Sequence, residues 1–502
     1  MVEQTNQMTA QNSLALEELQ AGTVPFSELV QQLSRIVGKS NIVFDADELL
    51  VYECDGYIVD KKAPDIVVFP TSTEQVSAIV KQCNQFNVPF LARGAGTSLS
   101  GGCLPIGGGV MIVLTKMKNI LEINLRDRYA IVEPGMVNLH LTNALKGTGY
   151  HYAPDPSSQG ACTIGGNIST NSGGPHTLKY GVTTNHVLGL EAVLPDGSII
   201  ELGGTTAEVP GYDLHGLYVG NEGTFGICTK AIVRLTRDPE SHRTMLAIFQ
   251  TIGDATRAIS EIIAASIIPS ALEMMDQGII QAVEEAFHFG FPLDAGAILL
   301  IEVDGLEIAL DEELRQILDI CNSCNVREIQ RAVTSEERLL IWKSRKQAFG
   351  AIGRLSPSYC TQDGVVPRTR LPEILEFIEE TSTRFGLRIV NVFHAGDGNV
   401  HPILLFDERD KDQVQKVMEA SESILEKCLE LGGSVTGEHG IGVEKINFMS
   451  RIFNEVDLAA METVRNIFNP RQICSRDKVL PRHQSDDNST ITQSHPTRRA
   501  PH

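Results

Sequence analysis

The sequence lacks the features that mark exported, membrane-spanning and nucleic-acid-binding proteins. Residues 1–20 carry no cationic start followed by an apolar run, and no segment reaches the ~18 apolar residues of a membrane span. No basic cluster interrupts the net charge of −21, which repels phosphate backbones and anionic lipids. We therefore expect a cytoplasmic protein whose partners are proteins or small molecules, with no nucleic acid and no membrane span.

The ten cysteines lack the spacing of a disulfide framework, and a chain of 502 residues needs no such cross-links. We expect them to be reduced thiols. Cys321 and Cys324 form a single Cys-x-x-Cys pair at the end of a helical pattern, which favours a structural role over a zinc or redox site. No run of cysteines could bind an iron–sulfur cluster, so any cluster would have to come from another chain.

Hydrophobic periodicity divides the chain into parts with different patterns of predicted strands and helices. A β-α-β pattern occurs near the start, with a helix over 71–87 and a capping box at Thr71 and Glu74. The later part alternates strands with long amphipathic helices, one of them spanning 336–355. The periodicity and composition predict four segments: a polar lead over 1–25, a glycine-rich domain over 26–238, an α+β domain over 239–481, and a disordered tail over 482–502.

A candidate metal site lies in the second domain. His394 and His401 are separated by a stretch whose glycines permit a tight backbone path, and Glu438 follows in a Gly-Glu-His-Gly motif. Two imidazoles and a carboxylate are ligands for catalytic zinc, manganese or iron. A His-x6-His pair alone is more often structural, but the second motif favours a metal. Asp397 and Asn399 are candidates to orient the imidazoles.

A glycine-rich loop over 93–102 follows a strand in the first domain. Such a loop can present several backbone N–H groups to a diphosphate, although an ordinary turn is the alternative. Its spacing matches neither the dinucleotide-binding fingerprint nor the P-loop. More glycine and polar loops in the same domain favour the diphosphate reading; they lie at 133–135, 154–158, 163–167, 171–174 and 219–227.

Together these loops and the two histidine motifs resemble the FAD-linked oxidases of the vanillyl-alcohol oxidase/p-cresol methylhydroxylase superfamily. The resemblance runs from about residue 40 to 481 and is strongest with the branch of glycolate oxidase D-subunits, D-lactate dehydrogenases and D-2-hydroxyglutarate dehydrogenases. It implies an α+β protein with a two-subdomain FAD-binding domain and an α+β cap domain that contains an antiparallel sheet. FAD is expected to be non-covalent, because His151, His176 and His186 fit ordinary polar loop positions.

The resemblance also assigns the residues that bind FAD. The loops at 93–98 and 163–167 would hold the diphosphate, while the segment near 223 would line the adenosine and ribityl side. The complete expected set is Arg93, Gly94, Ala95, Gly96, Thr97, Ser98, Pro134, Gly135, Asp155, Ser157, Thr163, Gly165, Gly166, Asn167, Ser172, Gly173, Glu222, Gly223, Thr224 and Ile227.

In the same family, a metal-bound 2-hydroxy acid loses its hydroxyl proton to a base while a hydride passes to flavin N5. His439 matches the catalytic base, since an imidazole titrates near working pH. Arg345 matches the arginine that binds the substrate carboxylate, although a solvated helix arginine is the alternative. Thr361 stands where relatives acting on the five-carbon diacid have a lysine, which favours a short monocarboxylate.

We therefore expect an FAD- and divalent-metal-dependent dehydrogenase that oxidises glycolate, D-lactate or both. One alternative is a flavin subunit of a multi-subunit glycolate oxidase that is inactive without an iron–sulfur partner. Another is a metal hydrolase in which the glycine loops are structural. The sequence leaves open the metal, the electron acceptor and the existence of a homodimer.

Overall fold

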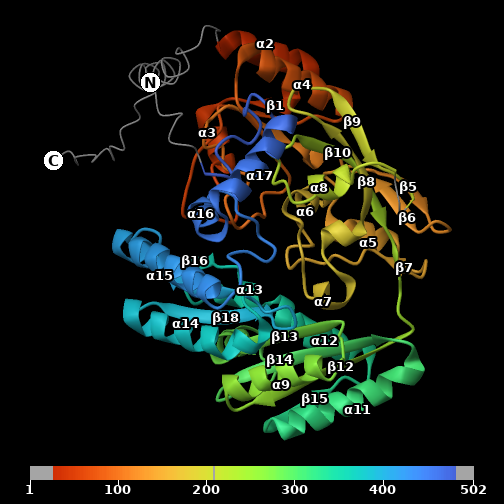
Figure 1. The fold of residues 1–502 in the computed structure, drawn as a ribbon, viewed down its shortest axis with the longest axis vertical. Helices are drawn as coiled ribbons and strands as arrows, with labels where there is room; N and C mark the ends of the chain where they lie inside the picture. The colour runs from red at the N-terminus through yellow and green to blue at the C-terminus, as the bar shows by residue number, and fades with distance from the viewer. Residues whose placement is uncertain (1–25, 207–209, 482–502) are drawn as a thin grey trace.

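The structure, a computed structural model, describes residues 26–206 and 210–481. The predicted lead over 1–25 and tail over 482–502 lie outside the described residues. Figure 1 shows two parts, one built from the first half of the chain and one from the middle, while the last helices return to the first part.

One half of the first part is a four-stranded sheet covered by helices. Strands β2, β4 and β3 are parallel, and β1 pairs antiparallel with β2. Val76, Val80 and Cys83 of α4 pack against the sheet in a shared core. The elements are α2 (Phe26–Val37), β1 (Ile42–Val43), α3 (Ala46–Leu49), β2 (Ile66–Val68), α4 (Thr73–Phe86), β3 (Phe90–Arg93) and β4 (Val110–Val113).

The other half is a five-stranded antiparallel sheet in the order β5-β6-β10-β8-β9. A turn at 195–197 connects β8 and β9. Its elements are β5 (Ile120–Asn124), β6 (Tyr129–Val132), α5 (Asn138–Ala144), β7 (Tyr150–His151), α6 (Ile164–Thr170), α7 (Thr177–Tyr180), β8 (Val187–Val193), β9 (Ile199–Gly203), α8 (Leu214–Tyr218), β10 (Ile227–Arg234) and β11 (Thr236–Arg237).

A large sheet forms the second part, and all of its strand pairs are antiparallel. Its main path is β15-β12-β14-β13-β18-β19-β17, and β20 joins β18 to β16. The strands are β12 (Ser241–Phe249), β13 (Ala271–Asp276), β14 (Ala297–Gly305), β15 (Val326–Arg331), β16 (Ser358–Thr361), β17 (Gly364–Val365), β18 (Arg388–His394), β19 (Asn399–Val400) and β20 (Pro402–Phe406).

Helices cover both faces of this sheet because its strands are apolar on both sides. Met245 and Leu299 belong to the core under α9, α11, α14 and α15, while Leu246 and Leu300 face α10, α12 and α13. The helices are α9 (Ile252–Ala264), α10 (Gln277–Phe287), α11 (Glu307–Ser323), α12 (Ser335–Lys346), α13 (Ala348–Ile352), α14 (Leu371–Phe385) and α15 (Lys411–Glu430).

The C-terminal described segment packs on the first part, beside its sheets (Figure 1). It contains α16 (Met449–Ile452) and α17 (Glu455–Phe468). The Phe468 ring stacks on Phe225 with centroids 4.7 Å apart, and Cys474 pairs with Phe90 in a β-bridge. The predicted domain over 239–481 therefore includes a segment that belongs spatially to the first part.

Two local predictions are wrong. The helix over 336–355 is divided, because α12 ends before Gln347 and α13 starts after it. The α4 cap is Ser72, whose side chain accepts a hydrogen bond from Gln75 N, so no capping box forms at Thr71 and Glu74. Both errors concern helix ends, where several neighbouring residues can serve the same purpose.

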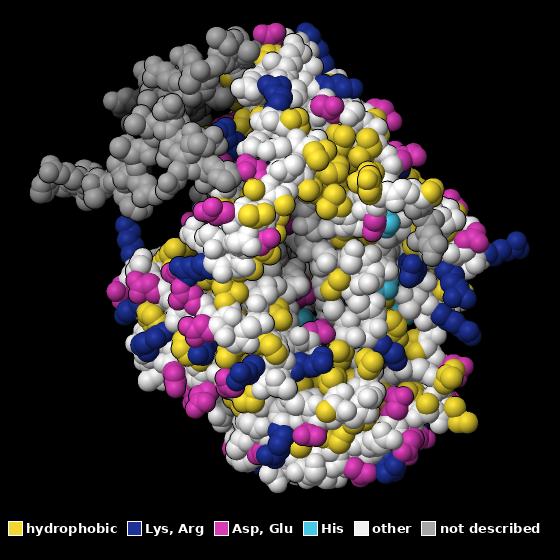
Figure 2. Space-filling view, viewed as in Figure 1, with side chains coloured by type: hydrophobic (Ala, Val, Ile, Leu, Met, Phe, Trp, Pro, Cys, Tyr) yellow, Lys and Arg dark blue, Asp and Glu magenta, His cyan; other side chains and the backbone are white. Residues whose placement is uncertain are grey.

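The surface charges and the cysteines of the structure can be compared with two expectations from the sequence, namely no basic cluster and no disulfide framework. Lys and Arg side chains are interspersed with Asp and Glu over the face seen in Figure 2, where no broad basic area occurs. All ten cysteines are free, and Cys321 and Cys324 are buried at the end of α11. Within the described ranges, the helices are too short or too polar to cross a membrane.

Candidate active site

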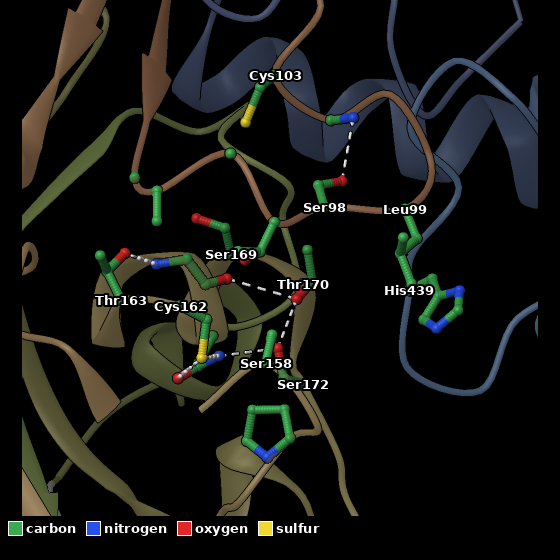
Figure 3. Close-up of a pocket in the computed structure, with 18 of the residues that line it drawn as sticks. Ser98, Leu99, Cys103, Ser158, Cys162, Thr163, Ser169, Thr170, Ser172 and His439 are labelled. Carbon is green, nitrogen blue, oxygen red and sulfur yellow. Dashed lines mark hydrogen bonds between the residues drawn. The ribbon is translucent and has the colours of Figure 1, made fainter. Parts of the chain in front are cut away.

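A cavity of about 340 Å³ lies where loops of the first part meet the second part. This volume is within the usual range of small-molecule sites. Figure 3 shows the hydroxyl side chains of Ser98, Thr163 and Thr170 around it, with His439 beyond Leu99 at one end. The second part contributes Lys346, Phe349, Tyr359, Thr361, His401, Glu438 and His439.

Most residues expected to bind FAD line this cavity. They are Arg93, Gly94, Ala95, Gly96, Thr97, Ser98, Pro134, Ser157, Thr163, Gly165, Gly166, Asn167, Ser172, Glu222, Gly223 and Ile227. Among the described residues, Gly135, Asp155, Gly173 and Thr224 are outside the lining. Asp155 instead bonds to His176.

The glycines of the 93–98 loop allow close approaches that a larger residue would block. A Cβ at Gly94 would lie 2.4 Å from Oγ1 of Thr163, which also lines the cavity. At Gly96, where φ is +74°, a Cβ would lie 2.1 Å from Arg93 Nη2. The Arg93 guanidinium is therefore folded over its own loop, and it also donates to Cys54 O at 2.9 Å. A cation beside a bare glycine backbone fits a diphosphate.

His394, His401 and Glu438 converge as the sequence predicted. Their candidate ligand atoms lie within 4.8 Å of one another, and both imidazole Nε2 atoms are 3.2 Å from Glu438 Oε1. His394 ends strand β18, His401 lies between β19 and β20, and Glu438 is on a later loop. The two histidines are nearly perpendicular, with centroids 5.2 Å apart. This donor set fits a divalent metal with open coordination positions.

The residues that orient the two imidazoles differ from those expected. His394 Nδ1 bonds to Glu273 Oε1 at 2.7 Å, and His401 Nδ1 donates to Gln362 O at 3.1 Å. Both outer nitrogens are thereby fixed, and each Nε2 is left for a metal. Asp397 and Asn399 do not have the orienting role that the sequence assigned to them.

Electrostatics hold Glu438 and His394 in their charged forms. Burial favours a neutral Glu438 carboxyl, but His394 and His401 lower its pKa well below the usual value. Burial also opposes a charged His394, yet Glu273 and Glu438 raise its pKa well above that of a free imidazole. A proton on His394 occupies the place that a divalent cation would fill.

His439 stacks on His401, with centroids 5.1 Å apart and planes inclined by 6°. Its Nδ1 is buried and has no hydrogen-bond partner among the described residues. Burial lowers the pKa of His439 to about 4, so the expectation that this imidazole titrates near working pH is corrected. The neutral ring lines the cavity.

Asp363 organises the loop that carries Glu438 and His439. Its Oδ2 accepts hydrogen bonds from Thr436 Oγ1 at 2.6 Å and from the amides of residues 437, 438 and 439 at 2.9, 3.0 and 2.8 Å. Asp363, His401 and His439 are also close enough to suggest a metal. Asp363 Oδ1 has no hydrogen-bond partner among the described residues. Asp363 Oδ2 and His401 Nδ1, however, are already engaged by protein groups, which favours the first cluster.

Residues expected to bind substrate occupy different positions. Thr361 lines the cavity, and its Oγ1 is buried without a hydrogen-bond partner in the described part of the chain. Arg345 is buried outside the lining, and its guanidinium lies 2.6 Å from Glu273 Oε2. Lys346, next to it, does line the cavity. The sequence analysis did not single out Lys346, because the family motif identified only its neighbour Arg345.

The three histidines considered for covalent flavin attachment have protein partners. His151 bonds to Asp238 at 2.8 Å, and His186 Nε2 donates to Tyr180 O at 2.8 Å. His176 stacks on the Trp342 indole at 5.1 Å between centroids. All three are outside the cavity lining within the described residues.

Comparison with known proteins identifies the family. Residues 64–203 match the FAD binding domain and residues 238–479 match the C-terminal domain of FAD linked oxidases. The chain is 42% identical to "Glycolate oxidase subunit GlcD" of Escherichia coli (strain K12), over 93% of this chain and 95% of the relative. The protein belongs to the FAD-linked oxidase family. It is an oxidoreductase with an FAD-binding domain.

Further relatives and solved structures agree with this assignment. GlcD of Bacillus subtilis (strain 168) is 39% identical over 90% of this FAD-linked oxidase and 97% of the relative. "D-lactate dehydrogenase" of Anaerostipes hadrus is 30% identical over 90% and 96%. The p-cresol methylhydroxylase structure has a TM-score of 0.74 at 17% identity, covering 90% of this chain and 96% of that one. The predicted fold class is confirmed.

Proposed function

We propose that this FAD-linked oxidase is a divalent-metal-dependent dehydrogenase that oxidises a short D-2-hydroxy acid, glycolate or D-lactate, to the 2-oxo acid. The observation that carries the proposal is the convergence of His401, Glu438 and His439 on the cavity lined by the glycine loops. The names of the relatives, glycolate oxidase subunit and D-lactate dehydrogenase, support this class of substrate. A metal hydrolase has no use for an FAD-binding domain and loses support.

Non-covalent FAD would be held by the residues of the first part that line the cavity. Arg93 supplies a positive charge, and the bare backbone at Gly94 and Gly96 admits a diphosphate. When bound, FAD supplies the hydride acceptor.

The histidine cluster would hold zinc, manganese or iron through His394, His401 and Glu438. A divalent cation there, when bound, supplies a Lewis acid that lowers the pKa of a substrate hydroxyl. His439 lines the cavity and accepts the hydroxyl proton at a ring nitrogen. Stacking on His401 holds the base beside the cluster.

Substrate selection would depend on the wall formed by α12, α13 and β16. Thr361 offers an unpaired hydroxyl to a small polar group, whereas a lysine there would suit a second carboxylate. The monocarboxylate would be bound by Arg345, provided that its pairing with Glu273 opens toward the cavity. Lys346 at the lining provides an additional cation for the same anion.

The electron acceptor could be a partner subunit with an iron–sulfur cluster. The support is that similar proteins are called subunits of a glycolate oxidase. In that case the isolated chain would reduce its flavin but turn over slowly without the partner. A homodimer and a cytoplasmic location stay predictions.

An anaerobic titration of the purified FAD-loaded protein tests the proposal. Glycolate, D-lactate, L-lactate and D-2-hydroxyglutarate are added separately, and loss of oxidised-flavin absorbance is followed. Glycolate or D-lactate should bleach the flavin at the highest specificity. A colourless protein after FAD reconstitution, or preference for D-2-hydroxyglutarate, contradicts the proposal.

A further inference from the structure

The loop that carries Glu438 and His439 is held from both parts of the protein. Asp363 binds its amides from the second part, as described above. The segment that follows, over 440–443, crosses to the loops of the FAD-binding part. The position of the candidate metal ligand and base is therefore set by two independent anchors.

Glu222 is the main anchor from the FAD-binding part. Its Oε1 accepts from Ile441 N at 2.8 Å, and its Oε2 accepts from Gly442 N at 2.7 Å. Ser100 adds three bonds, since its Oγ donates to His439 O at 3.0 Å and its carbonyl accepts from the amides of residues 443 and 444 at 3.0 and 3.3 Å. The Glu222 carboxylate thus engages loop amides, although the residue was expected to bind the cofactor.

Two glycines make this contact possible. Gly440 has a φ of +88°, and a Cβ there would lie 2.8–3.0 Å from the Glu222 carboxyl group. Gly442 has a φ of +55°, and a Cβ there would lie 2.0 Å from Ser100 O. Glu222 itself has a φ of +53°, a conformation rare for residues with side chains. The backbone on both sides is thus adapted to the contact.

We infer that Glu222 is a positioning residue that clamps the loop over 438–443 to the FAD-binding part and thereby fixes Glu438 and His439 at the cavity. A carboxylate that accepts two backbone N–H groups forms charge-assisted bonds, which are stronger than neutral ones. If Glu222 loses one acceptor oxygen, the loop over 438–443 becomes less tightly held. The candidate metal ligand Glu438 lies only three residues before Ile441, the first residue whose amide Glu222 binds. The inference rests on the proposed function only for its metal readout.

Glu222→Gln is the central test, because the amide retains one acceptor oxygen and places an N–H group against the other amide. Ser100→Ala is a milder second variant that removes the bond to His439 O. Glu201→Gln, an exposed change on β9, is the matched control. All three are prepared as full-length, FAD-loaded proteins.

Three measurements are made on each protein: hydrogen exchange of peptides covering 438–443, Mn²⁺ affinity against a competing chelator, and FAD content. For Glu222→Gln we expect faster exchange in this segment and a Mn²⁺ affinity lower by roughly 10- to 100-fold, the usual cost of disturbing a ligand's support. At saturating Mn²⁺ the bleaching rate should fall while the apparent substrate affinity changes by less than about twofold. Ser100→Ala should move in the same direction by less.

Two results overturn the inference. If FAD content falls while loop exchange and Mn²⁺ affinity stay at wild-type values, Glu222 is a cofactor ligand. If nothing changes relative to Glu201→Gln, the contact has no positioning role. Hydrogen exchange is measured on metal-free protein without substrate, so it tests the clamp separately from the metal. A wild-type protein that binds neither Mn²⁺ nor Zn²⁺ nor Fe²⁺ contradicts the proposed function, and the exchange data still test the clamp.

Discussion

Glu273→Gln should weaken metal binding without unfolding the protein. Glu273 is 1% exposed on β13 and lies opposite His394 in the register with β18. Its carboxylate joins His394 Nδ1 at 2.7 Å to Arg345 at 2.6 Å. Glutamine can still accept from His394, but it lacks the charge that polarises the imidazole toward a cation.

The magnitude follows from the bond that is weakened. A hydrogen bond to a charged group contributes about 1.5–3 kcal/mol, and each 1.4 kcal/mol corresponds to about tenfold in affinity. We expect Mn²⁺ affinity to fall by roughly 10- to 100-fold, which agrees with the usual effect of removing the partner of a ligand histidine. The assay is a Mn²⁺ titration of FAD-loaded protein against a competing chelator.

Glu302→Gln is the matched control. Glu302 is equally buried on the neighbouring strand β14, but it binds Arg338 at 2.7 Å and Trp342 at 2.8 Å instead of a metal ligand. Its loss should lower the thermal unfolding temperature and leave Mn²⁺ affinity unchanged. If Glu273→Gln, still cooperatively folded, binds Mn²⁺ within about twofold of wild type, Glu273 does not orient His394.

Three further predictions concern the flavin loop, the junction of the two parts and the base. Gly94→Val should abolish FAD binding, measured by absorbance after reconstitution, because its Cβ would lie 2.4 Å from Thr163 Oγ1; normal FAD content would show that the loop can open. Burial opposes a charged His176, but Asp155 and Glu302 raise its pKa from 6.5 to about 10. This histidine therefore stabilises the fold fully below pH 6.5, and its contribution is lost as the pH rises through about 10. Urea unfolding should show that slope in wild type and lack it in His176→Phe, and equal slopes would contradict the assignment. His439→Ala should retain FAD and metal but bleach roughly 10²- to 10⁴-fold more slowly in stopped flow; an unchanged rate would remove His439 from the reaction.

Local patterns predicted the candidate metal cluster because its histidines lie on either side of one tight turn. His394 and His401 are brought together by the β18–β19 hairpin, where His394 pairs with Asn399. Gly398, with a φ of +73°, permits this path. The Gly-Glu-His-Gly motif could be recognised for the same reason, since its residues act as one short segment.

Residues that act across the fold could not be found in this way. Glu273 is 121 residues from His394, and Glu222 is 219 residues from Ile441. In the sequence, Glu273 stands out only as an acidic residue within an apolar strand. A buried carboxylate requires a partner, but the sequence pattern does not show which residue that partner is. Strand pairing supplies that partner. Asp363 lies two residues after Thr361, yet the four groups that donate to it come from a loop more than 70 positions later.

The most direct test of the account is the anaerobic bleaching of FAD by glycolate or D-lactate in metal-stripped protein. Chelation should leave FAD in place, because the residues around Arg93 and those around His401 form separate walls of the cavity. Bleaching should disappear in the stripped protein and return on addition of zinc or manganese. If protein shown to be metal-free by elemental analysis bleaches at the wild-type rate, His394, His401 and Glu438 are not a catalytic metal site.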